Sequence, residues 1–104
     1  MTYYYFYILR STKNGKLYLG FTRDPFKRHI KHNSGTEPAT KLNIPYELIY
    51  FSGFKNKEDA VACERYFKTT SGWKRLKNML ERTLIQEKLN LSSASLPRKE
   101  QNTL

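Results

Sequence analysis

The first thirty residues carry the pattern that most constrains the fold of this chain. The run Tyr3–Leu9, YYYFYIL, is built from aromatic and aliphatic residues, which favour β-strands. Because successive side chains point to opposite faces of a strand, Tyr7 falls on the face opposite to Phe6. A second strand is expected over 16–21, after the turn residues STKNG, in which Gly15 can adopt a positive φ. The segment therefore predicts an antiparallel hairpin.

The length of the turn gives an expected register for this hairpin. If Leu9 pairs with Lys16, Tyr7 lies opposite Tyr18, and two phenols share one face of the sheet within cross-strand reach. Gly20 follows two residues after Tyr18, and a glycine in a strand lets another group approach the backbone closely.

A short helix is expected at 24–34. An aspartate followed by a proline opens it, because aspartate caps helices and proline is tolerated in the first turn. Phe26 and Ile30 are four residues apart and are expected to face the core. Arg28 and His32 have the same spacing on a neighbouring face. We expect this arginine and histidine to meet the two tyrosines of the hairpin on one patch.

The rest of the chain supplies one more strand and two more helices. The segment 46–54, YELIYFSGF, is apolar on both faces and is expected to be a strand. Apolar residues recur at helical spacing over 56–69 and again over 71–88. The predicted fold class is α+β, with a small, mixed three-stranded sheet flanked by about three helices. Residues 1–90 should form a single domain, and the polar segment 91–104 is expected to be a disordered tail.

The charge balance narrows the function. Lysine and arginine number 19 against 9 acidic residues, a formal net charge of +10, which favours a nucleic acid as partner. Scattered solvated lysines are the plainer explanation, but the charge coincides with many aromatic residues. Candidate phosphate contacts are Lys41, Lys68, Lys74 and Arg75. Each could equally be a solvated charge.

Several other classes of protein are not expected. The chain has no apolar run of about 18 residues, so no membrane span is predicted. It begins with a strand rather than with the charged leader of a signal peptide. A single cysteine, Cys63, cannot form an intramolecular disulfide, and a reducing cytoplasm is the simplest setting. The histidines lack partners at zinc-ligand spacing.

The order and spacing of these residues resemble the GIY-YIG nuclease domain. The resemblance covers about four-fifths of the chain, and is strongest to small bacterial proteins related to the catalytic module of the nucleotide-excision-repair incision subunit. It rests on Tyr5-Phe6-Tyr7, Tyr18-Leu19-Gly20, Arg28, His32, the segment IPYELIY at 44–50, and Glu64 in the sequence ACER.

In the hairpin, the resemblance implies that Tyr7 and Tyr18 are the two motif tyrosines and Gly20 the motif glycine. The tripeptides themselves differ from the literal motif, and Phe21 stands where the incision subunits carry a lysine. That departure leaves the substrate and the rate open. Tyrosine is also a good strand former, so most tyrosines of this chain are expected to be packing residues.

On the helices, the resemblance implies a catalytic arginine at Arg28 and a metal-binding glutamate at Glu64. His32 stands where the family carries a histidine or a tyrosine. It further implies a divalent metal ion, Mg²⁺ or Mn²⁺, and DNA as substrate. For Glu64, the alternative is a structural salt bridge to an arginine of the same domain; as a ligand, it should lie near Arg28 and attract it when no metal is bound.

The functional hypothesis is therefore a metal-dependent endonuclease that hydrolyses phosphodiester bonds in DNA, in repair or in the processing of branched DNA. The alternatives are a non-catalytic nucleic-acid-binding module on a nuclease scaffold, and a nuclease that acts on RNA. A partner protein or a second copy of the chain is a candidate source of specificity for so small a domain.

Overall fold

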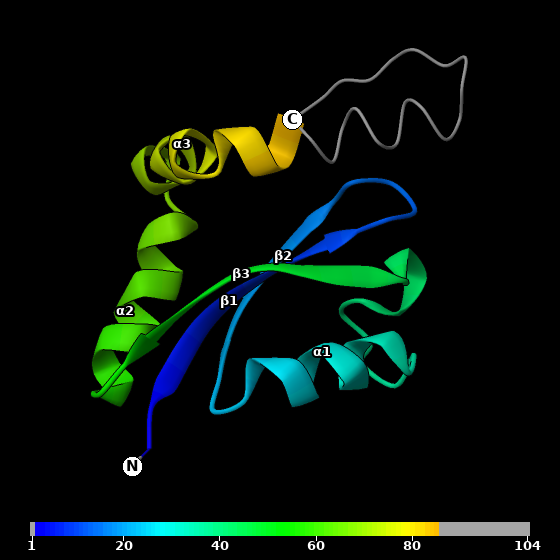
Figure 1. Ribbon diagram of the computed structural model, residues 1–104, viewed down its shortest axis with the longest axis horizontal. Coiled ribbons are helices and arrows are strands. Elements are labelled where there is room, and N and C mark those ends of the chain that lie inside the picture. The colour runs from blue at the N-terminus through cyan, green and yellow to red at the C-terminus, as the bar shows by residue number, and fades with distance from the viewer. Residues whose placement is uncertain (1, 86–104) are drawn as a thin grey trace.

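The computed structural model describes residues 2–85 and shows a three-stranded sheet between helices (Figure 1). The strands are β1 (Tyr4–Ser11), β2 (Leu17–Thr22) and β3 (Tyr46–Phe54), in the order β2-β1-β3. Both pairings are antiparallel, so the expectation of a mixed sheet was wrong, whereas the α+β class is confirmed. The predicted tail at 91–104 lies outside the described residues.

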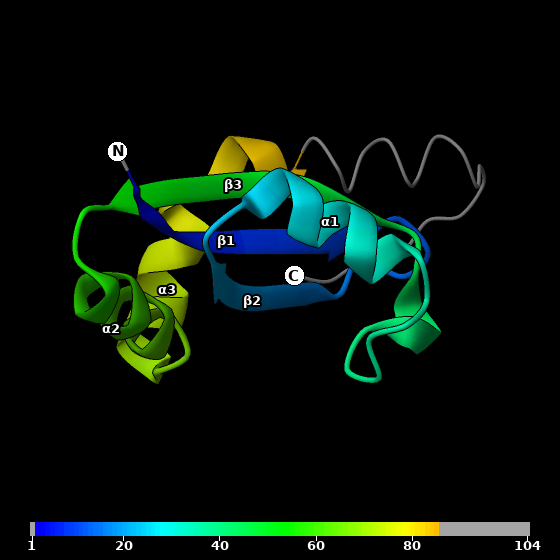
Figure 2. The same cartoon turned by 90° about the horizontal axis from the view of Figure 1, so that it is seen from below.

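Helices cover both faces of the sheet. The helices are α1 (Pro25–Asn33), the short 3-10 helix η1 (Lys41–Asn43), α2 (Lys57–Phe67) and α3 (Thr70–Met79), and residues 81–85 are helical again. The sheet separates α1 from α3 in Figure 1, and Figure 2 shows α1 lying across the strands. None of the described helices has the length and apolarity needed to cross a membrane.

The alternation of side chains along β1 divides the core into two clusters. Phe6 and Ile8 pack with Leu76 and other apolar residues of α2, α3 and the following turn. On the other face, Tyr7 and Leu9 form a cluster with Tyr46, and this is the face that α1 covers. The apolar side of α3 is buried in this cluster, as the helical spacing of its apolar residues predicted.

The hairpin register differs from the expectation by two residues. Leu9 pairs with Tyr18, and Tyr7 pairs with Gly20. The turn is centred further along the chain, because the Ser11 hydroxyl oxygen accepts hydrogen bonds from two backbone N–H groups of the turn, at 3.1 Å each. A shift of two residues preserves the face of every side chain, so Tyr7 and Tyr18 still lie on the same side of the sheet.

The orientation of α1 was predicted wrongly. Phe26 and Ile30 are 59% and 70% exposed instead of facing the core. The helix contacts β3 through polar side chains: Asn33 accepts from the backbone N–H of Tyr46 at 2.7 Å and donates to its carbonyl oxygen at 2.9 Å. His29 hydrogen-bonds the same carbonyl at 2.7 Å. These bonds turn the polar side of the helix inward and leave its apolar residues outside.

Candidate functional site

Tyr7 and Gly20 are paired at the centre of the sheet. The Tyr7 side chain lies over the glycine so closely that a Cβ at position 20 would be 2.6 Å from the Tyr7 hydroxyl oxygen. Only glycine leaves room for the phenol at this position. Tyr7 is 1% exposed, so the surrounding packing fixes its ring in place.

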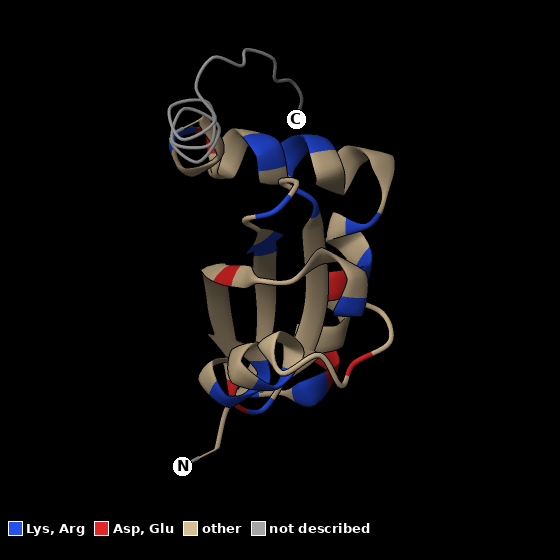
Figure 3. Cartoon of the chain, turned by 90° about the vertical axis from the view of Figure 1, so that its right-hand side faces the viewer, with Lys and Arg blue, Asp and Glu red and all other residues tan. Residues whose placement is uncertain are grey.

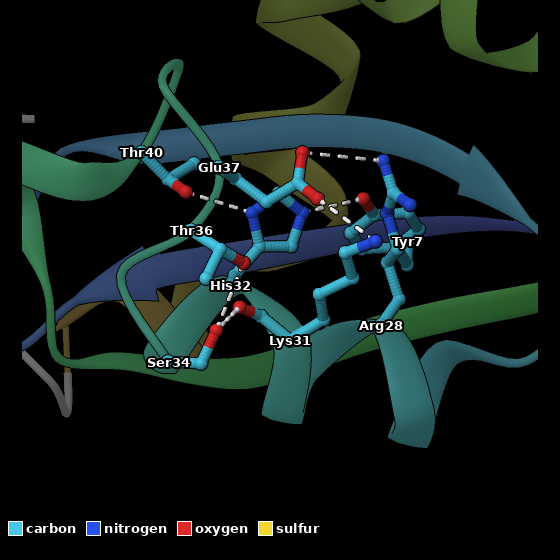
Figure 4. A network of polar contacts seen from close by, with 8 residues as sticks. All are labelled: Tyr7, Arg28, Lys31, His32, Ser34, Thr36, Glu37 and Thr40. Atoms are coloured by element: carbon cyan, nitrogen blue, oxygen red, sulfur yellow. Dashed lines mark hydrogen bonds and ion pairs between the residues drawn. The ribbon is translucent and has the colours of Figure 1, made fainter.

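A buried polar chain runs from Tyr7 to the segment after α1 (Figure 4). The Tyr7 hydroxyl is hydrogen-bonded to Nε2 of His32 at 3.0 Å, and Nδ1 of His32 to the Thr40 hydroxyl at 2.7 Å. His32 and Thr40 are both fully buried. A neutral imidazole carries one N–H, so His32 donates through one ring nitrogen and accepts at the other. This hydrogen-bonded series of side chains can therefore pass a proton between the phenol and the threonine hydroxyl.

Burial sets the charge state of both rings. It raises the pKa of Tyr7 to about 12, while the neighbouring Arg28 guanidinium acts in the opposite direction. Burial, and after it the positive charge of Arg28, lowers the pKa of His32 below its ordinary value of 6.5. At neutral pH the phenol is protonated and the imidazole uncharged. Tyr7 therefore holds its proton tightly, and His32 is its uncharged hydrogen-bond partner.

Arg28 brings a half-exposed cation to this chain. Its Nη2 lies 3.8 Å from Oε1 of Glu37, whose other oxygen is 3.5 Å from Nζ of Lys31. Contact with the Tyr7 phenol raises the pKa of the guanidinium, so Arg28 remains charged. Its Nε is buried and has no hydrogen-bond partner among residues 2–85. Buried donors without a partner are rare in folded proteins, so this position is unusual.

Tyr18 completes the aromatic side of the site. Its ring centroid lies 4.9 Å from that of His32 and 6.3 Å from that of Tyr7. Unlike those two residues, Tyr18 is only partly buried. Together with Arg28 it forms the part of the site that a substrate in solution can reach.

Glu64 lies on α2 and acts on the site through its charge. The negative charge contributes to the raised pKa of Tyr7, so the carboxylate lies within electrostatic reach of the phenol. Its ion-pair partner is Lys68, one turn further along the helix, at 2.7 Å. The expected attraction between Glu64 and Arg28 was wrong, because Arg28 pairs with Glu37 from the segment after α1.

The structure supplies few protein ligands for a metal ion. Residues 2–85 contain no group of three or more His, Cys, Asp or Glu side chains that could hold one. Glu64 would be a single carboxylate ligand. Mg²⁺ fits such a site, because it is often held by one or two carboxylates together with waters and substrate phosphate oxygens.

The four basic candidates are exposed but do not gather in one place. Lys68 follows α2 and pairs with Glu64, and Lys41 begins η1 on the segment that also carries Thr40. Lys74 and Arg75 lie on α3, across the sheet from α1. Figure 3 shows this division, with basic segments on α3 and around α1. Contacts of these four residues with phosphates stay a prediction.

The family model described as the GIY-YIG catalytic domain matches residues 3–78. The chain belongs to the GIY-YIG family. The match spans every residue of the site, from the hairpin tyrosines to Glu64 on α2. Membership places the chain among nuclease-type hydrolases that act on DNA.

Small bacterial proteins are similar to this GIY-YIG chain over most of their length. A UPF0213 protein of Lactococcus lactis is 38% identical over 89 residues, which cover 85% of each chain. A UPF0213 protein of Staphylococcus saprophyticus is 40% identical over 82 residues, covering 78% of this chain and 99% of its own. No solved structure matches this chain.

The sequence did not reveal two residues of this GIY-YIG site. Glu37 and Thr40 lie in the irregular segment between α1 and β3, where no periodicity shows which side chains point inward. Thr40 is completely buried, and Glu37 is the ion-pair partner of Arg28.

Proposed function

We propose that this protein is a metal-dependent endonuclease that hydrolyses phosphodiester bonds in DNA. The observation that carries the proposal is the convergence of Tyr7, Arg28 and His32, with Glu64 within electrostatic reach of the phenol. These residues come from β1, α1 and α2, and a simple binding surface would not need to bring them together.

Arg28 would bind the scissile phosphate. A guanidinium is always charged, and its planar fork of N–H donors matches phosphoryl oxygens. Its ion pair with Glu37 is long, at 3.8 Å, and the Arg28 side chain is 35% exposed, so a phosphate can replace the carboxylate at little cost. The N–H donors of the guanidinium can stabilise charge as it develops on those oxygens.

Tyr7 and His32 would move the proton of the attacking water. The neutral imidazole can take the phenol proton when its Nδ1–H points to the Thr40 oxygen, which leaves the phenol oxygen free to accept a proton in turn. Arg28 favours the ionised phenol, while burial opposes it. An approaching cation would act in the same direction as Arg28.

Glu64 would hold the metal ion, in exchange for its ion pair with Lys68. When bound, a divalent ion polarises the phosphate and stabilises the leaving oxygen. Lys68 is 55% exposed and can swing into solvent when the cation arrives. We assign Mg²⁺ or Mn²⁺ to this position because the ligand is an oxygen.

We further propose that the natural substrate is branched or damaged DNA, as in repair, and that a partner protein or a second copy of the chain contributes specificity. The family match over residues 3–78 is to a catalytic domain, which accounts for cleavage but does not select one DNA structure. The rival is a binding module that retains the basic surface without catalysis.

One experiment tests the nuclease proposal against its rivals. Purified protein is incubated with supercoiled plasmid and with flapped, branched, duplex and single-stranded DNA, in Mg²⁺, in Mn²⁺ and in EDTA, with matched RNA substrates alongside. We expect cleavage of at least one DNA substrate in metal and none in EDTA. Salt-dependent binding with no cleavage of any substrate would favour the binding module, and cleavage of RNA alone would overturn the choice of DNA.

A further inference from the structure

An aromatic pocket lies beside the hydrogen-bonded side chains of Tyr7 and His32, on the α1 side of the sheet. It has a volume of about 210 Å³ and is lined by Tyr5, Arg23, Asp24, Pro25, Phe26 and Phe51. None of these residues takes part in the proton chain or in the ion pairs of Arg28. The pocket is therefore a separate feature that the proposed chemistry does not explain.

Three aromatic rings form the wall of the pocket. Phe26 and Phe51 meet edge to face, with centroids 5.3 Å apart at 74°, and Tyr5 meets Phe51 in the same way at 5.9 Å and 71°. Phe26 is 59% exposed and Phe51 is 42% exposed. In edge-to-face packing the edge of one ring covers one face of its neighbour, and the exposure of Phe26 and Phe51 leaves part of each ring accessible to a flat ligand. Large apolar side chains gathered on a surface indicate a binding site.

The pocket adjoins the position where the phosphate would bind. Phe51 is the β3 partner of Tyr7, and Tyr5 lies two residues before Tyr7 on the same face of β1. Two residues of a strand span roughly 7 Å. A ligand in the pocket is thus a neighbour of Tyr7, whose phenol in turn contacts Arg28.

The charges around the pocket favour an anionic ligand. Arg23 lies 5.5 Å from the centroid of the Tyr4 ring, and Lys27 is exposed in the first turn of α1. The one carboxylate in the wall, Asp24, already accepts hydrogen bonds from the backbone N–H groups of Phe26 and Lys27, at 3.1 Å each. Its charge is engaged in capping the helix, where it is partly neutralised.

We propose that the pocket binds one unpaired nucleobase of the strand whose phosphate reaches Arg28. A flat ring attached to a phosphate chain matches both the aromatic wall and the positive rim. The volume lies below the range of roughly 300–1,000 Å³ that is usual for drug-sized ligands, which suits a single base. The proposal rests on the proposed nuclease function and adds a substrate class: DNA with an unpaired base next to the cleavage point.

The test compares binding of a labelled single strand and of the matching duplex by fluorescence anisotropy in EDTA, so that cleavage plays no part. The variant is Phe26→Leu, which keeps an apolar side chain but removes the ring face. Ile30→Ala is the matched control, since Ile30 is exposed on the same helix but outside the pocket. Circular dichroism of each protein checks that it is folded.

We expect Phe26→Leu to weaken single-strand binding by about 5- to 150-fold, the range for loss of a stacked base. Duplex binding and the salt dependence should stay the same, because no charge is removed. Ile30→Ala should match the wild type on both ligands, and Phe26→Trp should retain single-strand affinity.

Equal single-strand affinities for the wild type, Phe26→Leu and Ile30→Ala would overturn the proposal. So would conversion of a dimer into a monomer by Phe26→Leu with single-strand affinity unchanged, since the rings would then form a contact between copies. Pocket-dependent binding by a protein that cleaves no DNA would support the base site while refuting the nuclease function, so the two failures are distinguishable.

Discussion

Replacing Gly20 with alanine tests whether the tyrosine–glycine pair positions the Tyr7 phenol. The new Cβ would meet the Tyr7 hydroxyl oxygen at 2.6 Å and the ring carbon that carries it at 2.7 Å. Tyr7 is almost completely buried, so its ring cannot move aside without disturbing its neighbours. We expect Gly20→Ala to displace the phenol from His32 and to reduce cleavage strongly.

The size of the effect follows from two opposing contributions. Overpacking a well-packed site costs about 1–3 kcal/mol. Alanine is otherwise better than glycine inside a strand by roughly 0.5–1 kcal/mol. The net loss of unfolding free energy should therefore be up to about 2.5 kcal/mol, and each kcal/mol lowers the melting temperature of a domain of this size by about 4–8 °C.

A double-mutant cycle with Tyr7→Leu separates the clash from other effects of the alanine, with thermal and urea unfolding as the assays. When the phenol is absent, Gly20→Ala should become stabilising by about 0.5–1 kcal/mol, which reverses the sign of its effect. Equal destabilisation of both backgrounds by Gly20→Ala, or unchanged stability and activity of the protein that keeps Tyr7, would show that the phenol does not require glycine at position 20.

Three further predictions concern His32, its partner Thr40, and Lys68, the ion-pair partner of Glu64. The pKa of His32 is lower in the folded protein than in the unfolded chain, so the unfolded chain binds more protons as the pH drops below about 6.5, and the stability should fall there. His32→Gln should flatten that part of a plot of melting temperature against pH. Thr40→Val leaves a buried ring nitrogen unpaired and should cost about 1–3 kcal/mol in urea unfolding, whereas Thr40→Ser should restore most of the loss. Lys68→Ala removes a largely exposed ion pair, so stability should change by less than about 1 kcal/mol, while the Mn²⁺ concentration for half-maximal cleavage should fall because Glu64 is freed. An unchanged Mn²⁺ requirement would count against the ligand role of Glu64.

The faces of the sheet were predictable from the sequence, and the exact pairing was not. Alternation along 3–9 placed Tyr7 opposite to Phe6, and the structure buries them in separate clusters. The register depended on hydrogen bonds from turn backbone to the Ser11 side chain, which turn length alone does not specify. The two-residue error was harmless to the site because strand side chains repeat every two residues.

The position of α1 was harder to predict because polar contacts fix it. Helical spacing correctly placed Arg28 and His32 on one side of α1, but hydrophobicity wrongly assigned Phe26 and Ile30 to the core. Because α1 contacts β3 through the polar side chain of Asn33, Phe26 and Ile30 lie at the surface. The partner of Glu64 could have been predicted, since Lys68 follows it at the spacing of helical ion pairs.

The central claim, that Glu64 is the metal ligand of a nuclease, is tested most directly by the cleavage rate of Glu64→Gln relative to the wild type in Mg²⁺ and Mn²⁺. The exchange keeps the shape of the side chain and removes its charge. Its ion pair with Lys68 is largely exposed, so the melting temperature should stay nearly constant. We expect a folded protein that binds DNA as tightly as the wild type or more tightly and cleaves none of it. An unchanged cleavage rate in the folded variant would exclude Glu64 as the metal ligand.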